Sequence, residues 1–225
     1  IHGAEALLRW EHPVAGRISS PLMVKLAEEE SFLDELGLYI IKEACKDAQK
    51  LQKEGTPLSI SVNISPKQLE SAVFVREVRR ILQEVDLHDI QLILEVTERS
   101  LLSTSGRILE RIRELKQLGI QMSMDDFGMG HSSMMYLQEN AFDEVKLDGS
   151  LVRQILENER SRDIVRGITR LAASMQFHVV AEFVETREQM ELLKALHCDI
   201  YQGYYYGKPC SCDEFIIKYL KQEFR

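Results

Sequence analysis

The chain has 225 residues, of which 44% are hydrophobic and 28% are charged, and its formal net charge is -8. These values are ordinary for a globular protein with a full apolar core, and the excess of acids argues against a nonspecific polynucleotide binder, which would carry a basic stripe. No run of about 18 apolar residues and no charged-then-apolar leader occurs, so neither a membrane span nor a signal peptide is predicted. We therefore expect a cytoplasmic chain, or the cytoplasmic part of a larger protein that is itself free or membrane-bound.

Cysteine usage and chain organisation point to one domain in a reducing compartment. Cys45, Cys198, Cys210 and Cys212 form no C-x-x-C pair and have no histidine at zinc spacing, so free thiols are predicted. No low-complexity tract, Pro/Gly-rich linker or solenoid repeat divides the chain. A single domain over residues 1–225 is therefore expected.

Taken in chain order, short apolar runs alternate with helical patterns, as strand-helix units require. Strands are predicted near residues 3–9, 58–63, 90–95, 120–125, 142–146, 177–182 and 199–202. Between them, apolar residues recur on one helical face over residues 33–51 and again over residues 108–118. The sequence therefore predicts an α/β fold built on a parallel sheet.

A parallel sheet of this length is either open and doubly wound or closed as a barrel. No dinucleotide-type G-x-G-x-x-G follows the first strand, which favours the barrel. A barrel of this kind normally has eight strands, whereas the sequence predicts one fewer and opens at Ile1 already inside a strand. We therefore expect the first strand to be missing and the domain to be incomplete at its N-terminus.

Polar side chains of the metal-ligand type lie on several predicted strands. Asn63, Glu95 and Asp125 occupy the same phase of three successive strands, and because side chains alternate faces with period two, all three are predicted to point into the barrel. Glu5 lies in the first strand, and Glu182 ends the sixth. Such oxygen donors are typical of Mg²⁺, Mn²⁺ or Ca²⁺ sites rather than zinc sites. For any single acid, a solvated strand end or a helix cap is the alternative.

Asp125 and Asp126 are adjacent like charges at the end of a predicted strand, and they repel each other. A cation, a network of hydrogen-bond donors or plain water has to compensate this repulsion. The convergence of further acids on neighbouring strands favours the cation.

The chain also contains a series of spaced motifs, which in order are GAEALLRW (3–10), VNIS (62–65), EVTE (95–98), DDFG (125–128), KLD (146–148), VVAEFVET (179–186) and QGYYY (202–206). With these motifs the sequence resembles the EAL domain family from Gly3 to Pro209. The resemblance implies a modified TIM (β/α)8 barrel that binds the bacterial messenger cyclic di-GMP and hydrolyses one phosphodiester to give linear pGpG. The family's first strand, with its Tyr-Gln-Pro-Ile-like segment, has no counterpart here, in agreement with the expected missing strand.

By resemblance, Glu5, Asn63, Glu95, Asp125 and Asp126 are the ligands of two Mg²⁺ or Mn²⁺ ions, with Asp125 bridging them. The family implies a two-metal, water-activated in-line displacement, in which two ions hold the attacking and leaving oxygens. Inhibition by Ca²⁺ is also expected from the family.

The resemblance further implies roles for residues that touch the reaction. Lys146 matches a lysine beside the attacking water, Glu182 matches the candidate general base, and Glu185 matches an acid that orients the lysine. Glu98 matches an acid that stabilises the loop after the paired aspartates. Without the resemblance, a lysine whose stem covers apolar surface and loop acids in solvent are the alternatives.

Residues of the substrate pocket follow in the same way. Arg9 and Asp148 match residues that contact phosphate and guanine, and Gln202 and Pro209 match residues that line the pocket; an arginine suits phosphate through its fork of donors. Asp148 has a helix N-cap as its alternative role. Phe183 replaces the glycine of the family's AEGVE motif, and we hypothesise that it stacks on a guanine. The alternative is that its ring blocks the approach of the backbone to the ligand.

Two further departures from the family pattern concern loops. Met129 replaces the threonine of DDFGTGYSS, which removes a hydroxyl from the loop that Glu98 is expected to stabilise. The family's KIDRSF is KLDGSL here, with Gly149 in place of an arginine. None of the departures removes a metal ligand.

The retained ligands favour an active, metal-dependent phosphodiesterase. A receptor module that binds cyclic di-GMP without cleaving it, and a barrel that serves only as an interaction platform, are the alternatives. By resemblance we also expect a homodimer and an upstream sensory or GGDEF domain in the full-length protein, and no polynucleotide partner.

Overall fold

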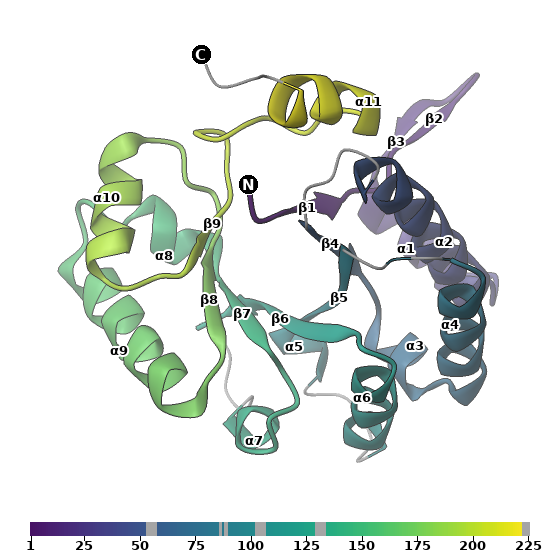
Figure 1. Ribbon diagram of the computed structural model, residues 1–225, viewed down its shortest axis with the longest axis horizontal. Helices are drawn as coiled ribbons and strands as arrows, with labels where there is room; N and C mark the ends of the chain where they lie inside the picture. Colours follow the sequence, from purple (N-terminus) through teal and green to yellow (C-terminus); the bar gives the residue numbers. More distant parts are fainter. Residues whose placement is uncertain (53–57, 86, 88–89, 102–106, 129–133, 222–225) are drawn as a thin grey trace. The chain divides into compact units, whose positions relative to one another are not determined.

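The computed structural model describes residues 1–52, 58–85, 87, 90–101, 107–128 and 134–221, and strands alternate with helices along them (Figure 1). The strands are β1 (Gly3–Ala6), β2 (Trp10–His12), β3 (Gly16–Ile18), β4 (Leu58–Asn63), β5 (Ile90–Thr97), β6 (Gln121–Phe127), β7 (Glu144–Leu147), β8 (His178–Ala181) and β9 (Ile200–Tyr201). The helices are α1 (Ser20–Glu29), α2 (Leu33–Gln52), α3 (Pro66–Glu70), α4 (Ala72–Glu84), α5 (Glu98–Leu101), α6 (Ile108–Gln117), α7 (Met134–Gln138), α8 (Gly149–Arg153), α9 (Glu159–Met175), α10 (Arg187–Ala195), α11 (Cys212–Phe215) and the π-helix η1 (Ile216–Leu220).

Among the described residues, the strands predicted from the sequence form one seven-stranded sheet of order β1-β4-β5-β6-β7-β8-β9. The strand pairs β1–β4, β6–β7, β7–β8 and β8–β9 are parallel. The neighbours in the sheet follow the order of the chain, apart from the separate hairpin β2–β3. This confirms the predicted α/β class and the seven predicted strands.

The prediction of a first strand over residues 3–9 is wrong at its end. Strand β1 stops at Ala6, which pairs with Val62 next to the last residue of β4, so the chain beyond Ala6 leaves the ladder. Arg9 therefore lies outside the strand in which the sequence placed it. The chain continues instead into the antiparallel hairpin β2–β3, which was not predicted from the sequence. Its turn ends at Gly16, where φ is +70°.

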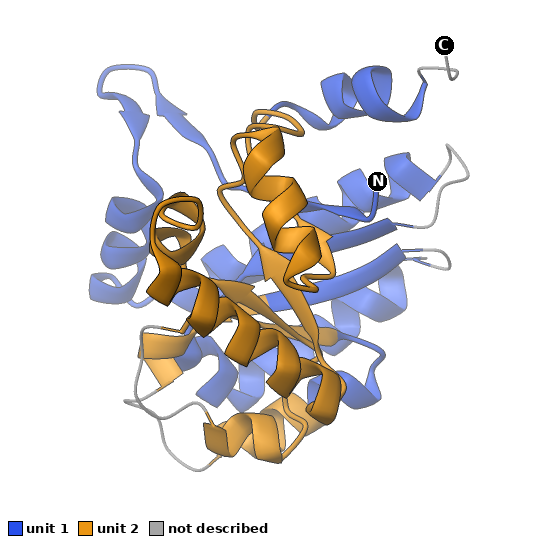
Figure 2. Ribbon diagram, turned by 90° about the vertical axis from the view of Figure 1, so that its left-hand side faces the viewer, with its two compact units in different colours: residues 1–94, 114–120, 210–225 blue, residues 95–113, 121–209 orange. Residues whose placement is uncertain are grey.

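The contacts within the chain group it into two compact units, which Figure 2 shows in different colours. The first unit contains residues 1–94, 114–120 and 210–225, and the second contains residues 95–113 and 121–209. Strand β5 contributes residues to both.

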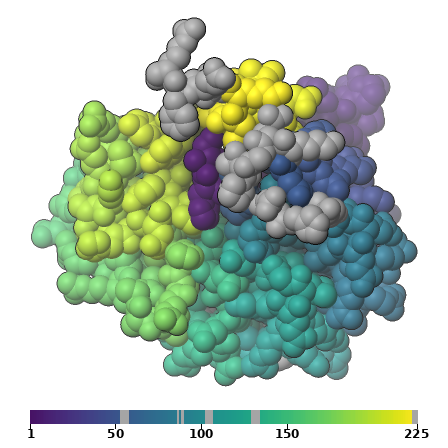
Figure 3. All heavy atoms as spheres, viewed as in Figure 1, coloured from purple at the N-terminus to yellow at the C-terminus, as the bar shows by residue number. Residues whose placement is uncertain are grey.

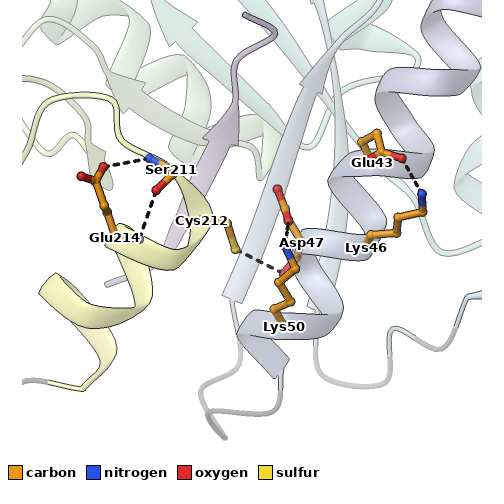
Figure 4. A network of polar contacts seen from close by, with 7 residues as sticks. All are labelled: Glu43, Lys46, Asp47, Lys50, Ser211, Cys212 and Glu214. Carbon is orange, nitrogen blue, oxygen red and sulfur yellow. Dashed lines mark hydrogen bonds and ion pairs between the residues drawn. The ribbon is translucent and has the colours of Figure 1, made fainter.

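In the first unit, helix α2 packs on β4 through buried apolar residues that recur at helical spacing, among them Ile41, Ala44 and Ala48. The C-terminal helix α11, yellow at the surface in Figure 3, starts with a capping box between Ser211 and Glu214. It lies beside α2, where Cys212 Sγ is 3.8 Å from the carbonyl oxygen of Asp47 (Figure 4).

In the second unit, the parallel strands β6 to β9 carry a core that includes Met122, Val145 and Val179, each fully buried. Helix α9 packs against β8, and α10 begins with a capping box between Thr186 and Gln189.

The four cysteines of the chain are free, as predicted. Among the described residues, no helix is both long and apolar enough to cross a membrane.

Candidate active site

A buried ion-pair network surrounds the ammonium group of Lys146 in the second unit. Lys146 lies near the carboxyl end of β7, and its Nζ is 2.8 Å from Glu95 Oε2 and 2.8 Å from Glu182 Oε1. The side chains of Lys146 and Glu95 are 2% and 1% exposed, and that of Glu182 is 11% exposed. Buried charges are costly unless they are paired, so this lysine and its two acids depend on one another. The cluster thus combines Glu95 of β5, Lys146 of β7 and Glu182, which follows β8.

Glu182 and Phe183 leave strand β8 as a bulge. The backbone N–H of Gln202 donates to the carbonyl of Ala181 at 2.8 Å, and the N–H of Val184 donates to the carbonyl of Gln202 at 3.0 Å. Two residues therefore lie opposite one, the arrangement by which bulges redirect side chains. The φ of Phe183 is +54°, in a region that aromatic residues seldom adopt and that costs about 1–3 kcal/mol.

The ring of Phe183 contacts helix α8 at two positions. A Cβ on Gly149 would lie 2.5 Å from Cδ2 and 2.7 Å from Cε2 of the ring, so only glycine fits there without displacing it. The guanidinium carbon of Arg153 lies 4.1 Å from the ring centroid, a cation-π distance. Phe183 nevertheless keeps 42% of its surface exposed, which leaves part of the ring open to a ligand.

The sequence predicted that the strand ends at Asp125, but β6 continues to Phe127 and contains both Asp125 and Asp126. The N–H of Asp126 donates to Asp125 Oδ1 at 2.8 Å, and the φ of Asp126 is +57°. Partial burial raises the pKa of Asp126, and the charges of Asp125 and Asp148 raise it further, against the opposite effects of Arg99 and Lys146. The charges of Asp125 and Asp148 add a negative potential around Asp126, and a cation offsets a potential of this sign.

Glu5 and Asn63 lie together in the first unit. The amide Nδ2 of Asn63 donates to Glu5 Oε1 at 2.7 Å. The register of the parallel pair β1–β4 explains the contact, because Glu5 lies opposite Ser61 and Asn63 ends β4 two residues later. Two of the predicted ligand residues, far apart in the sequence, are thus in contact.

Asp148 takes the capping position that was its alternative role. Its Oδ1 accepts a hydrogen bond from the N–H of Ser150 at 2.7 Å, which caps α8. Of the other predicted pocket residues, Gln202 lies opposite the bulge at Glu182 and is half-buried, and Pro209 is exposed. Arg9 is exposed and donates to the carbonyl of Leu8 at 3.0 Å.

Glu98 is buried at the start of α5, and its Oε2 accepts from the N–H of Gly128 at 3.4 Å. The predicted role of Glu98 in stabilising the loop after β6 stays a prediction. Met129 of that loop lies outside the described residues. Glu185 is exposed, and its N–H donates to Gln189 Oε1 at 2.8 Å in the cap of α10.

Two features of this site were not predicted from the sequence. They are the pairing of Glu95 with Lys146 and the position of Arg153 against the ring of Phe183. The only available signal for Arg153 was its spacing of one helical turn from the unusual Gly149.

The metal prediction can be compared with the donor chemistry of the site. Among the described residues, no group of three or more His, Cys, Asp or Glu side chains is arranged to hold a metal ion. The donors that the two units do present are carboxylates and one amide, namely the Glu5–Asn63 pair and the Asp125–Asp126 pair. Oxygen donors of this type fit Mg²⁺ or Mn²⁺.

Comparison with known proteins gives a consistent result. The model of the EAL domain family matches residues 1–209. The chain is 40% identical to an uncharacterized signaling protein of Caulobacter vibrioides, over 95% of this chain and 26% of that protein. It is 34% identical to the cyclic di-GMP phosphodiesterase NbdA of Pseudomonas aeruginosa, over 97% of this chain and 28% of that protein. The chain thus spans well under a third of the length of these relatives.

Solved structures agree with this. The cGMP-bound EAL enzyme Bd1971 matches with a TM-score of 0.86 and 31% identity, over 96% of this chain and 60% of that one. The PaMucR phosphodiesterase in complex with cyclic di-GMP matches with a TM-score of 0.83 and 34% identity, over 95% of this chain and 87% of that one. These matches confirm the predicted fold class, the modified TIM barrel of EAL proteins.

Proposed function

Because the chain belongs to the EAL domain family, we propose that it is a phosphodiesterase that hydrolyses cyclic di-GMP to linear pGpG. The observation that carries the proposal is the buried lysine with two carboxylates: Lys146 lies 2.8 Å from both Glu95 and Glu182. A buried charge network of this kind is weak evidence for stability, and it is expected where chemistry is done. The names of relatives such as NbdA support the same reaction.

In the proposed reaction, a water oxygen forms a bond to phosphorus while the bond from phosphorus to one ribose oxygen breaks. Glu182 accepts a proton from the attacking water, and the departing ribose oxygen takes up a proton from solvent water. Lys146 positions the water through its ammonium group, and Glu185 orients the lysine. Glu98 holds the loop after β6 through Gly128.

We propose substrate contacts for five residues. Arg9 binds a phosphate, and Asp148, which lies at the start of α8, binds a guanine in addition to capping the helix. Gln202 and Pro209 line the pocket, and the exposed part of the Phe183 ring stacks on a base.

We propose that the reaction depends on Mg²⁺ or Mn²⁺ and that two ions take part. Their ligands would be Glu5, Asn63, Glu95, Asp125 and Asp126, with Asp125 shared. When bound, such ions neutralise phosphate charge and lower the pKa of a coordinated water. Calcium, which tolerates longer and more variable coordination, would inhibit.

The wider context is also a proposal. Residues 1–225 form one EAL domain, which is supported by a family match that runs through both units. The domain dimerises and works downstream of a sensory or GGDEF domain, in line with relatives such as the bifunctional diguanylate cyclase/phosphodiesterase MucR. The free cysteines agree with a cytoplasmic location.

One assay tests the function. The chain is incubated with cyclic di-GMP and Mn²⁺, and bound nucleotide and linear product are both followed. Formation of pGpG supports the proposal. Binding without product would indicate a receptor module instead, and absence of both would indicate an interaction platform. The matched variants are Glu182→Gln, which should lose turnover, and Glu157→Gln, an exposed acid that should keep it.

A further inference from the structure

Lys146 and Glu182 lie on neighbouring strands, and the residues that follow each of them meet again. Strands β7 and β8 pair in parallel with Lys146 opposite Val180. Gly149 comes three residues after Lys146, at the start of α8, and Phe183 comes directly after Glu182. Gly149 lies against the ring of Phe183. The segments that follow Lys146 and Glu182 are therefore in contact with each other, as are the two charged side chains.

The backbone alone does not determine where Glu182 points. Ala181 and Val184 are both held by hydrogen bonds to Gln202, and the two residues between them bulge away from that pairing. Bulges next to active sites change the direction of the side chains that they carry. In this bulge Phe183 carries the left-handed backbone conformation, with φ +54°.

The ring of Phe183 is held in turn by helix α8. The helix presents Gly149 in its first position, where the absence of a side chain leaves room for the ring. It presents Arg153 one turn later, with its guanidinium carbon 4.1 Å from the ring centroid. The large residue in the bulge and the small residue on the helix are therefore complementary in size.

We propose that Phe183, Gly149 and Arg153 form a clamp that holds Glu182 against Lys146, so that all three are positioning residues for the hydrolysis. This inference rests on the proposed function, because it assigns Glu182 and Lys146 to the reaction. It assigns to Phe183 a role in turnover that is separate from any contact of its exposed face with a base.

The test is a double-mutant cycle between Gly149→Ala and Phe183→Gly, with kcat, KM and the Kd of cyclic di-GMP in Ca²⁺ measured for each variant. A methyl group at position 149 displaces the ring, so Gly149→Ala lowers kcat at least tenfold, and any change in Kd reports the separate contact of the ring with a base. Phe183→Gly also lowers kcat. In that background Gly149→Ala has no further effect, because the ring it would strike is absent.

Gly167→Ala is the matched control, since Gly167 lies in α9 and a Cβ added there would meet nothing within 4 Å. It keeps the wild-type kcat. Melting temperatures are recorded for all variants. If Gly149→Ala does not fold, Arg153→Ala is used in its place. The control for Arg153→Ala is then Arg170→Ala, which changes an exposed arginine. Arg153→Ala is then expected to lower kcat about threefold, and Arg153→Lys to recover part of the loss.

Three results would overturn the clamp: an unchanged kcat in Gly149→Ala, an equal loss in both backgrounds, or a loss confined to Kd. A merely structural contact would show coupling in melting temperature without coupling in kcat. If the wild-type chain turns over and the coupling is absent, only the clamp fails. If the wild-type chain neither binds nor cleaves cyclic di-GMP, the proposed function fails with it.

Discussion

Lys146 and Glu95 form an ion pair of 2.8 Å in which both side chains are almost completely buried. Replacing Lys146 by methionine keeps most of its volume but leaves Glu95 and Glu182 without their shared cation. Breaking a buried pair from one side costs about 3–5 kcal/mol. Urea unfolding of Lys146→Met should therefore show a loss of this size.

Lys194→Met is the control for that measurement, because Lys194 is exposed on α10. Its free energy of unfolding should stay within about 0.5 kcal/mol of the wild type. Equal stability of Lys146→Met and Lys194→Met would mean that the buried pair is not formed.

Asp126 gives a pH dependence with a definite sign. Its pKa is raised by partial burial and by the nearby charges of Asp125 and Asp148, so the folded protein binds the proton of Asp126 more tightly than the unfolded chain does. Its contribution to stability is therefore present below the ordinary aspartate pKa of about 4 and is lost as the pH rises through the higher folded value. Asp126→Asn, which also tolerates the positive φ, removes this loss.

The free energy of unfolding of the wild type and of Asp126→Asn is measured between about pH 3 and pH 8, a range that includes the ordinary aspartate pKa. EDTA is present to remove divalent ions. Asp126→Asn should gain stability over the wild type as the pH rises, and the gain should vanish at the acid end. A gain that grows toward acid pH would contradict the raised pKa. Added Mg²⁺ should reduce the gain, because a cation compensates the repulsion in the wild type alone.

Asp148 has two proposed roles that different substitutions separate. Serine is as good an N-cap as aspartate, whereas alanine cannot accept the hydrogen bond from Ser150. Asp148→Ala should lose about 1 kcal/mol of stability and Asp148→Ser close to none. If Asp148 also binds the guanine, the Kd of cyclic di-GMP rises in both variants. An unchanged Kd in Asp148→Ser would leave the residue with the cap alone.

Glu5 tests the metal prediction in the first unit. Glu5→Gln keeps the carbonyl oxygen that accepts from Asn63 and loses only the charge, whereas Glu5→Ala loses the contact as well. Both variants should lose at least about 100-fold in Mn²⁺-dependent turnover, since a direct ligand matters at least as much as the outer partners of a metal site. Calorimetry should show weaker Mn²⁺ binding with an unchanged melting temperature in Glu5→Gln. Full turnover in this variant would exclude Glu5 as a ligand.

The sequence by itself determined the architecture and the positions of the acids. Alternating apolar runs and helical faces require a parallel sheet, and the period of two in each strand assigns Asn63, Glu95 and Asp125 to one phase. These are local properties, because each follows from residues within a single strand or helix. The motifs then supplied the family.

Only the tertiary structure decided which groups become partners. Glu95 pairs with Lys146, 51 positions away, and a strand's period reports the face of a side chain but not its neighbour on another strand. The end of β1 at Ala6 and the hairpin β2–β3 follow from strand pairing, which residues within a single strand do not reveal. Phe183 likewise has a left-handed backbone, and its ring lies against Gly149 and Arg153, which are distant in the sequence. Backbone strain of this kind persists only where the surrounding structure offsets it.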